Sequence, residues 1–211
     1  MGLGPYHEAM AAAPAPAPAT APAPAETLTR SQAARRGRVI DAAIELAAEG
    51  GYDAVQMRDV AARAQVALGT IYRYFSSKDQ LLAAALVQWA AEMELRLTQR
   101  PARGSTATDR VVDVLRRASR ALEENAQLTA ALVTAIASPD PAVRDCQTDV
   151  SGIMVKLLSS ALTDVDEAER DGIMRVLSWV WFAALIGWVN GWSNSGTVGA
   201  ELENAARLLL R

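Results

Sequence analysis

Cysteine and histidine are almost missing from this 211-residue sequence, which contains one of each, Cys146 and His7. A single cysteine excludes an internal disulfide and a cysteine-based metal cluster, and it is typical of a reducing compartment. Because His7 lies in the N-terminal tail, the folded part has no imidazole for a Ser-His-Asp triad or a metal-histidine site. Neither glycine-rich phosphate-binding pattern, G-x-x-x-x-G-K or G-x-G-x-x-G, occurs. These absences argue against an enzyme, and we expect neither a metal ion nor a cofactor.

The chain also lacks a strong net charge and a long hydrophobic run. Its formal net charge is −3, so the overall composition does not indicate a nucleic-acid partner. Residues 30–80, however, contain eight Lys and Arg against six Asp and Glu, while acidic residues predominate on both sides. The longest apolar stretch, Val176–Val189, has fourteen residues, fewer than the roughly 17–25 that cross a bilayer. No secretory signal pattern opens the sequence, so we expect a cytoplasmic protein outside the membrane.

Proline divides the chain into a tail and a helical part. Residues 11–25 alternate Ala with Pro, which favours an extended conformation without a core, so we interpret residues 1–28 as a disordered tail. From Arg30 onward apolar residues recur at helical spacing, and proline is absent until Pro101. We therefore predict an all-α protein with two folded domains, residues 29–82 and residues 83–211.

Four helices are predicted between residues 29 and 99. The first carries an apolar stripe over Val39–Ala47 and stops at a glycine pair, and the second covers Met57–Ala64. The third covers Ala67–Tyr74, and a capping box opens the fourth, which runs from Ser77 to about Gln99. Two short helices joined by a tight turn are typical of a helix-turn-helix, whose second helix enters the major groove of DNA.

Side chains suited to DNA gather on the third helix and its flanks. Gly69 lets the backbone approach closely, and the amides of a helix N-terminus favour phosphate oxygens. Tyrosine and lysine side chains that follow are donors for the phosphate backbone. For the arginines at 36 and 58, an ordinary solvated surface is the alternative. The predicted DNA-binding residues are Arg36, Gln56, Arg58, Ala67, Leu68, Gly69, Thr70, Tyr72, Arg73, Tyr74 and Lys78.

The segment GYDAVQMRDVAARAQVALGTIYRYFSSKDQLL, residues 51–82, resembles the N-terminal domain of the TetR family of one-component transcriptional regulators. Its VALGTIYRYFSSKDQLL portion matches the family pattern Gly-Thr-aliphatic-Tyr-x-Tyr/His-Phe-x-x-Lys-x-x-Leu. Within the family, GGYDAVQMRDVAARA and VALGTIYRYF are similar to KstR-type regulators of actinobacterial sterol catabolism, as are the weaker matches RVLSWVWFAALIGWV and AARLLL. The resemblance implies a repressor that binds palindromic double-stranded operator DNA as a homodimer and responds to a sterol-derived or acyl-CoA thioester effector.

The sequence departs from the family pattern in two places, at Gln65 and at Ala67-Leu68. Gln65 stands at a turn where many members have glycine, and a left-handed backbone there would cost a non-glycine residue roughly 1–2 kcal/mol. The alternative is a re-shaped turn. Ala67 and Leu68 replace a serine and a polar residue, so the third helix has a weaker cap, and Leu68 suits a thymine methyl better than a polar base edge.

Residues 83–211 offer broad apolar helix faces instead of polar constellations. We expect helices at roughly 108–124, 126–137, 141–163, 166–191 and 199–210. The 166–191 helix is apolar all round and must be covered on both sides. The resemblance implies that the last two helices form a dimer interface and that the middle helices enclose an effector pocket, although composition alone does not separate a pocket from a filled core.

Few charged residues interrupt these apolar faces, which favours a largely apolar ligand with a polar group near the pocket entrance. The candidate ligand-binding residues are Trp89, Met93, Leu115, Leu122, Leu132, Ile136, Met154, Leu158 and Phe182. The candidate interface residues are Trp181, Trp188, Trp192, Leu202 and Leu209. Two other interpretations stay open: a helical dimeric scaffold with no effector response, and an enzyme with an unrecognised carboxylate site.

Overall fold

The computed structural model describes residues 28–210, except for the side chain of Ser195. The predicted Ala/Pro-rich tail therefore lies, apart from its last residue, outside the described residues. The described chain is built from helices without strands, which confirms the all-α prediction. In chain order they are α1 (Arg30–Ala54), α2 (Met57–Arg63), α3 (Leu68–Tyr72), α4 (Lys78–Thr98), α5 (Ala107–Glu123), α6 (Ala126–Ile136), the 3₁₀ turn η2 (Pro141–Val143), α7 (Arg144–Ser159), α8 (Glu167–Val189) and α9 (Ser195–Leu209).

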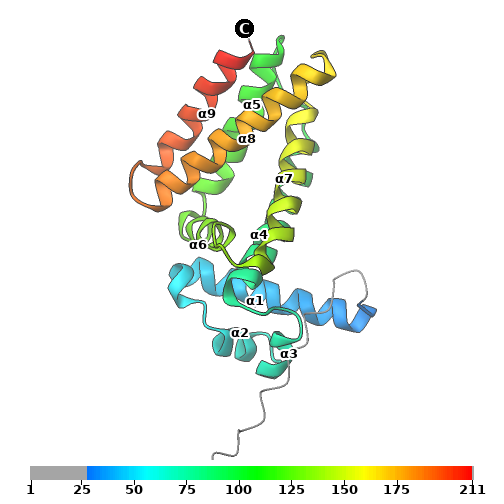
Figure 1. Ribbon diagram of the computed structural model, residues 1–211, viewed down its shortest axis with the longest axis vertical. Helices are drawn as coiled ribbons and strands as arrows, with labels where there is room; N and C mark the ends of the chain where they lie inside the picture. The colour runs from blue at the N-terminus through cyan, green and yellow to red at the C-terminus, as the bar shows by residue number, and fades with distance from the viewer. Residues whose placement is uncertain (1–27, 211) are drawn as a thin grey trace, which may run out of the picture.

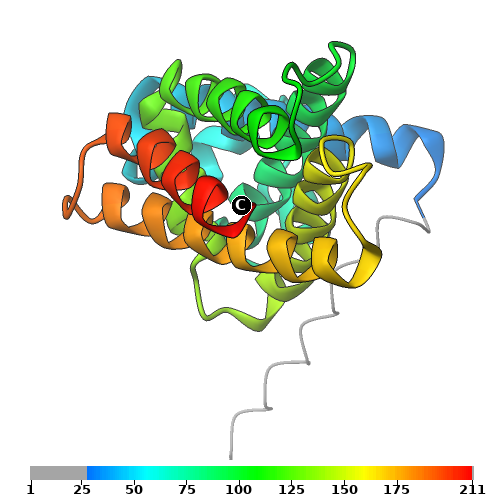
Figure 2. The same cartoon turned by 90° about the horizontal axis from the view of Figure 1, so that it is seen from above.

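Figure 1 shows that α1, α2 and α3 form one end of the molecule, while α5, α7, α8 and α9 form the other. The α4 helix leads from the first group into the second, and α6 lies against α1 between them. Seen from above, α8 and α9 run side by side along one face of the helical bundle (Figure 2). The predicted DNA-binding and dimerisation segments are therefore at opposite ends of the structure.

Local signals place the ends of the first and fourth helices. Thr29 caps α1 through a capping box with Gln32, so the arginines at 30, 35, 36 and 38 lie within the helix. The chain continues helically beyond a kink at Gly51, which has a φ of 71°. Ser77 caps α4, because its hydroxyl accepts a hydrogen bond from the Gln80 amide at 3.1 Å. In the predicted capping box the Gln80 side chain would accept from the Ser77 amide, but it accepts from the Ser76 amide instead.

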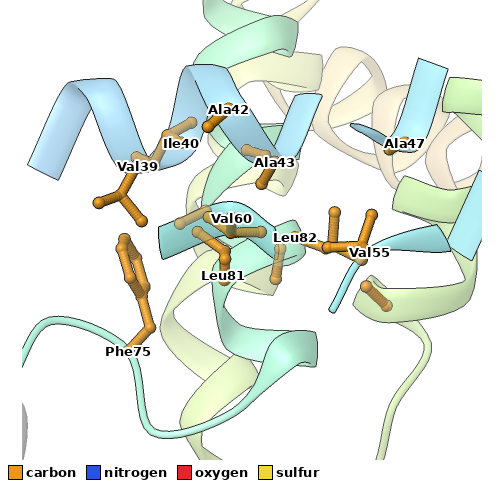
Figure 3. Close-up of a cluster of buried hydrophobic side chains, with 14 of the residues drawn as sticks. Val39, Ile40, Ala42, Ala43, Ala47, Val55, Val60, Phe75, Leu81 and Leu82 are labelled. Atoms are coloured by element: carbon orange, nitrogen blue, oxygen red, sulfur yellow. The ribbon is translucent and has the colours of Figure 1, made fainter. Parts of the chain in front are cut away.

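A core of small and branched side chains holds α1–α4 together. Figure 3 shows Phe75 pointing at Val39 of α1, with Leu81 of α4 beside Val60 of α2. Phe75 is only 1% exposed, and alanines on α1 and α4 let the two helices approach closely. The same core continues into α6, and the predicted domain boundary at residue 82 falls inside α4. The division into two domains stays a prediction.

The α8 helix differs from its neighbours in the apolar surface that it leaves exposed. Among the described helices it alone is long and apolar enough to cross a bilayer by length and composition, with a mean hydropathy of 1.6 over its most apolar stretch. Only 28% of that stretch is buried, although α8 packs against α6, α7 and α9. The fold thus leaves part of this helix uncovered.

Candidate nucleic-acid interface and ligand cavity

The turn between α2 and α3 has the geometry of a helix-turn-helix. Ala64 ends α2, and Gln65 follows with a φ of 54°, in the left-handed region that favours glycine. Val66 then donates its amide to the Ala61 carbonyl at 3.0 Å, which closes the turn. Of the two alternatives for this position, the left-handed one is present. Ala67 precedes α3 without any side-chain cap, as its residue type predicts.

The α3 helix buries one side and leaves the other open. Ile71 is fully buried, and Leu68 packs partly against the same core, so the contact of Leu68 with a thymine methyl stays a prediction. The exposed side presents Ala67, Gly69, Tyr72 and Arg73, with Thr70 partly exposed beside them. A side chain at Gly69 would meet no atom within 4 Å of its Cβ, so the surface there is open. This side has the shape and the donors that a groove of DNA requires.

Tyr74 was expected to contact phosphate, and that prediction is wrong. Its side chain is 4% exposed and packs edge-to-face on Phe75, with ring centroids 6.4 Å apart. Its hydroxyl is buried without a hydrogen-bond partner in the part of the chain that the structure describes. Tyr74 follows Ile71 by three residues, so both side chains turn toward the core.

Arg36 and Lys78 are both held against aromatic rings. The Arg36 guanidinium lies 5.0 Å from the centroid of Phe75, and its partial burial lowers its pKa. The Lys78 ammonium lies 3.7 Å from the centroid of Tyr52 and donates to the Tyr52 carbonyl at 3.2 Å. These cation–π contacts position the flanks of the helix-turn-helix. A phosphate contact by either side chain stays a prediction.

The remaining predicted DNA-binding residues, Gln56 and Arg58, are exposed at the start of α2. Gln56 also donates to the Asp53 carbonyl at 2.9 Å, which ties the turn before α2. Arg63, at the other end of α2, contacts α1 instead, where it forms ion pairs with Glu45 and Glu49. Its hydrogen bonds lower the pKa of the Glu49 carboxyl.

A cavity of about 720 Å³ lies between α4, α6, α7 and α8. Seven of the nine candidate ligand-binding residues line it: Trp89, Met93, Leu122, Leu132, Ile136, Met154 and Phe182. Leu115 and Leu158 do not; both are fully buried in the filled core around α5, α8 and α9, so their assignment to the pocket was wrong. Apolar helix faces that fill a core and those that line a cavity have the same residue types, and packing alone separates them.

Sequence analysis missed the polar residues of the cavity. Gln147 and Ser151 of α7 and Asp171, Arg175 and Ser178 of α8 contribute to its wall. The first four are exposed, so they lie toward the opening, while the deeper wall is mostly apolar, with the buried Thr129 as a polar exception. The sequence does contain a signal for two pairs, Gln147 with Ser151 and Asp171 with Arg175. The residues of each pair are four positions apart, which places them on one helix face.

Two of the five candidate interface residues were assigned to the wrong side. Trp181 is 4% exposed and lines the cavity, and Leu202 is fully buried inside the single chain. Trp188 and Leu209 are partly buried against the core, whereas Trp192 is 78% exposed just beyond α8. The large apolar side chains that α8 and α9 expose are Val176, Trp179, Phe182 and Leu208.

Within residues 28–210, no group of three or more His, Cys, Asp or Glu side chains is placed to hold a metal ion. The candidate sites in the described residues are therefore the open side of α3 and the mostly apolar cavity.

Comparisons with known proteins agree on both halves of the chain. Residues 39–85 match the profile "Bacterial regulatory proteins, tetR family", and residues 104–209 match "Tetracyclin repressor-like, C-terminal domain". The chain is 37% identical over 183 residues to the HTH-type transcriptional repressor KstR of Rhodococcus jostii strain RHA1, covering 86% of this chain and 85% of the relative.

Two solved structures have the same fold. A TetR transcriptional regulator from Rhodococcus sp. RHA1 superimposes with a TM-score of 0.75 at 31% identity, covering 86% of this chain and 98% of that one. FadR of Thermus thermophilus, a TetR-family transcriptional repressor solved with lauroyl-CoA, gives a TM-score of 0.67 at 20% identity, covering 83% and 93%.

Proposed function

This chain belongs to the TetR family as a KstR-like transcriptional repressor with a DNA-binding helix-turn-helix, and from that premise we propose that it binds a palindromic operator as a homodimer and is released by an apolar effector. The observation that carries the proposal is the pairing of an exposed α3 face with a large apolar cavity in one chain. Its relatives are repressors and not enzymes.

The α3 helix is the proposed recognition helix. Tyr72 and Arg73 reach outward from its C-terminal end, while Ala67 and Gly69 let its N-terminal end approach the groove closely. In a twofold dimer, two such helices bind successive major grooves, and we expect their separation to be about one helical turn of DNA, roughly 34–36 Å. Affinity falls steeply with salt, because these contacts are mainly to phosphates.

The proposed effector is a sterol-derived or fatty acyl-CoA thioester. A cavity of about 720 Å³ is within the usual size range of small-molecule sites, and its deep wall is mostly apolar. Arg175 and Asp171 at the opening face the polar part of such a ligand, and lauroyl-CoA bound to Thermus thermophilus FadR shows this ligand class on the same fold.

The proposed dimer interface is the outer face of α8 and α9. Val176, Trp179, Trp192 and Leu208 are exposed there, and a single subunit leaves them in water. A second copy related by a twofold axis would cover the same patch on both subunits.

Effector binding is proposed to reach DNA through α4. This helix is continuous from Lys78, near the recognition helix, to Trp89 and Met93 in the cavity wall. Lys78 and Trp89 are eleven residues apart, about 16 Å along a rigid helix. A shift at the cavity end would therefore alter the separation of the two recognition helices.

The decisive experiment is a titration of the protein against its own upstream region, with and without lauroyl-CoA or a steroid CoA thioester. We expect the effector to weaken operator binding by about 5- to 150-fold, and saturating operator to weaken effector binding by the same factor. Equal effector affinity with and without operator would contradict the release mechanism. A dimer that binds no duplex would instead support the alternative of a scaffold without effector response.

A further inference from the structure

Two short segments with the same pattern, Ser-x-Asp, meet between α4 and the loop that follows α6. One is Ser77-Lys78-Asp79 and the other is Ser138-Pro139-Asp140. The Ser77 hydroxyl donates to the Asp140 carboxylate at 2.6 Å, and the Ser138 hydroxyl donates to the Asp79 carboxylate at 2.6 Å. Each segment thus supplies one donor and one acceptor to the other. We call these two contacts the serine–aspartate bridge.

Further partners fix both carboxylates in place. The second oxygen of Asp79 accepts the Tyr52 hydroxyl from the end of α1, and the second oxygen of Asp140 accepts the Ala142 amide at 2.9 Å. The bridge therefore joins three elements that are distant in sequence. Hydrogen bonds to charged acceptors are about twice as strong as neutral ones. Three of these four bonds join separate elements, and the fourth, from the Ala142 amide, fixes Asp140 within its own loop.

The protonation states support this geometry. The Ser77 hydroxyl and the Ala142 amide hold the pKa of the Asp140 carboxyl below its usual range, so it is an ionised acceptor at neutral pH. Partial burial and the Asp79 carboxylate raise the pKa of Tyr52 to about 12, which keeps its hydroxyl a donor.

The position of the bridge relates it to both proposed activities. On one side, Ser77 caps α4 and follows the recognition helix α3 by only a few residues. On the other side, Ser138 lies two residues after Ile136, which lines the cavity and ends α6. Gln147, another cavity residue, donates to the Ile136 carbonyl at 2.8 Å. The bridge thus stands where the cavity wall meets the helix-turn-helix.

We propose that Ser138 and Asp140 are positioning residues for operator binding: through the serine–aspartate bridge they set the orientation of the helix-turn-helix on the rest of the subunit. Neither residue lies in the helix-turn-helix itself, and the buried residues at α3 are Ile71, Tyr74 and Phe75. A palindromic operator needs both recognition helices in a fixed relation, whereas an isolated half-site needs only one of them. This inference rests on the proposed function.

The test compares binding of the full-length protein to the palindrome of its own upstream region and to a single half-site duplex. Ser138→Ala and Asp140→Ala are expected to weaken palindrome binding by about tenfold, the loss typical of a hydrogen bond to a charged group, and to change half-site binding by less than about twofold. Ser138→Thr keeps the hydroxyl and should retain palindrome affinity. Ser160→Ala is the matched control, because that serine donates only to the Leu157 carbonyl of its own helix.

Unchanged palindrome affinity in both alanine variants would overturn the inference. Equal losses on the palindrome and the half-site would also overturn it, since they would indicate damage within α3. If the wild-type protein binds no duplex, the proposed function fails and this inference fails with it; if it binds and the variants bind equally well, only the inference fails.

Discussion

Two regions of the molecule are rich in apolar residues: the end formed by α1–α4 and the face formed by α8–α9. The regions differ in how much of that apolar surface the chain buries. Around α1–α4 most large apolar side chains are buried inside the chain, as Ile71, Phe75 and Leu81 show with at most 1% of their surface exposed. Along α8, Trp179 and Phe182 remain in solvent or at the edge of the cavity. The second region therefore exposes large apolar side chains in the single chain, and the proposed ligand and the proposed second copy would bury them.

The largest effect is expected when a charge is placed on the exposed apolar face of α8 and α9. Val176→Glu and Leu208→Glu are expected to separate the dimer and to weaken palindrome binding by about 10²- to 10⁴-fold, because two half-sites no longer share one ligand. Sedimentation and operator titration measure the two effects. Leu95 of α4 is 60% exposed and is the matched control, so Leu95→Glu should stay dimeric. Intact dimers for both α8–α9 variants would place the interface elsewhere.

The second test separates filled core from cavity wall. Leu158→Ala should lower the free energy of unfolding by about 2–5 kcal/mol, because it opens a hole in a closely packed region. Phe182→Ala should cost much less stability, since Phe182 is 38% exposed, but should weaken lauroyl-CoA binding. Chemical denaturation and ligand titration of both variants make the measurement. A reversed order of the two stability losses would contradict this division.

The third test concerns the open side of α3. Arg73→Ala should weaken binding to all duplexes by about tenfold and lower the salt slope by about one unit, because one phosphate contact is lost. Tyr72→Phe removes a donor without a charge and should leave the slope unchanged. Arg116 pairs with Glu203 at the far end of the molecule, so Arg116→Ala is the charge-matched control. An unaltered slope for Arg73→Ala would remove the contact.

The smallest expected effect lies at the turn between α2 and α3. Gln65 is exposed and left-handed, so Gln65→Gly should raise the free energy of unfolding by up to about 1 kcal/mol through relief of backbone strain. Gln65→Ala, which keeps the strain, should leave stability nearly unchanged. Thermal unfolding of the two variants decides the matter: a glycine variant no more stable than wild type would show that the turn is unstrained.

Much of the helix-turn-helix could be predicted from the sequence because its signals are local. Helical spacing over Met57–Ala64, the break at Gln65 and the cap at Ser77 each depend on residues within about four positions of one another. The same holds for the all-α fold. The orientation of individual side chains was harder to predict from the sequence. Tyr74 has a hydroxyl that could donate to phosphate, and only its packing on Phe75 shows that it is buried.

What the sequence by itself determined is the series of helices, since local periodicity and helix caps depend on neighbouring residues. Only the tertiary structure decided which side of α8 faces the cavity, because a helix that is apolar all round carries no signal of direction. That is why the sequence did not show that Trp181 of α8 lines the cavity. Leu158 of α7 likewise belongs to the filled core, and only the packing around it shows this. Only the tertiary structure, likewise, brought Ser77 and Asp140 together, because 63 residues separate the two partners of that hydrogen bond and only the packing of α4 against the end of α6 makes them neighbours.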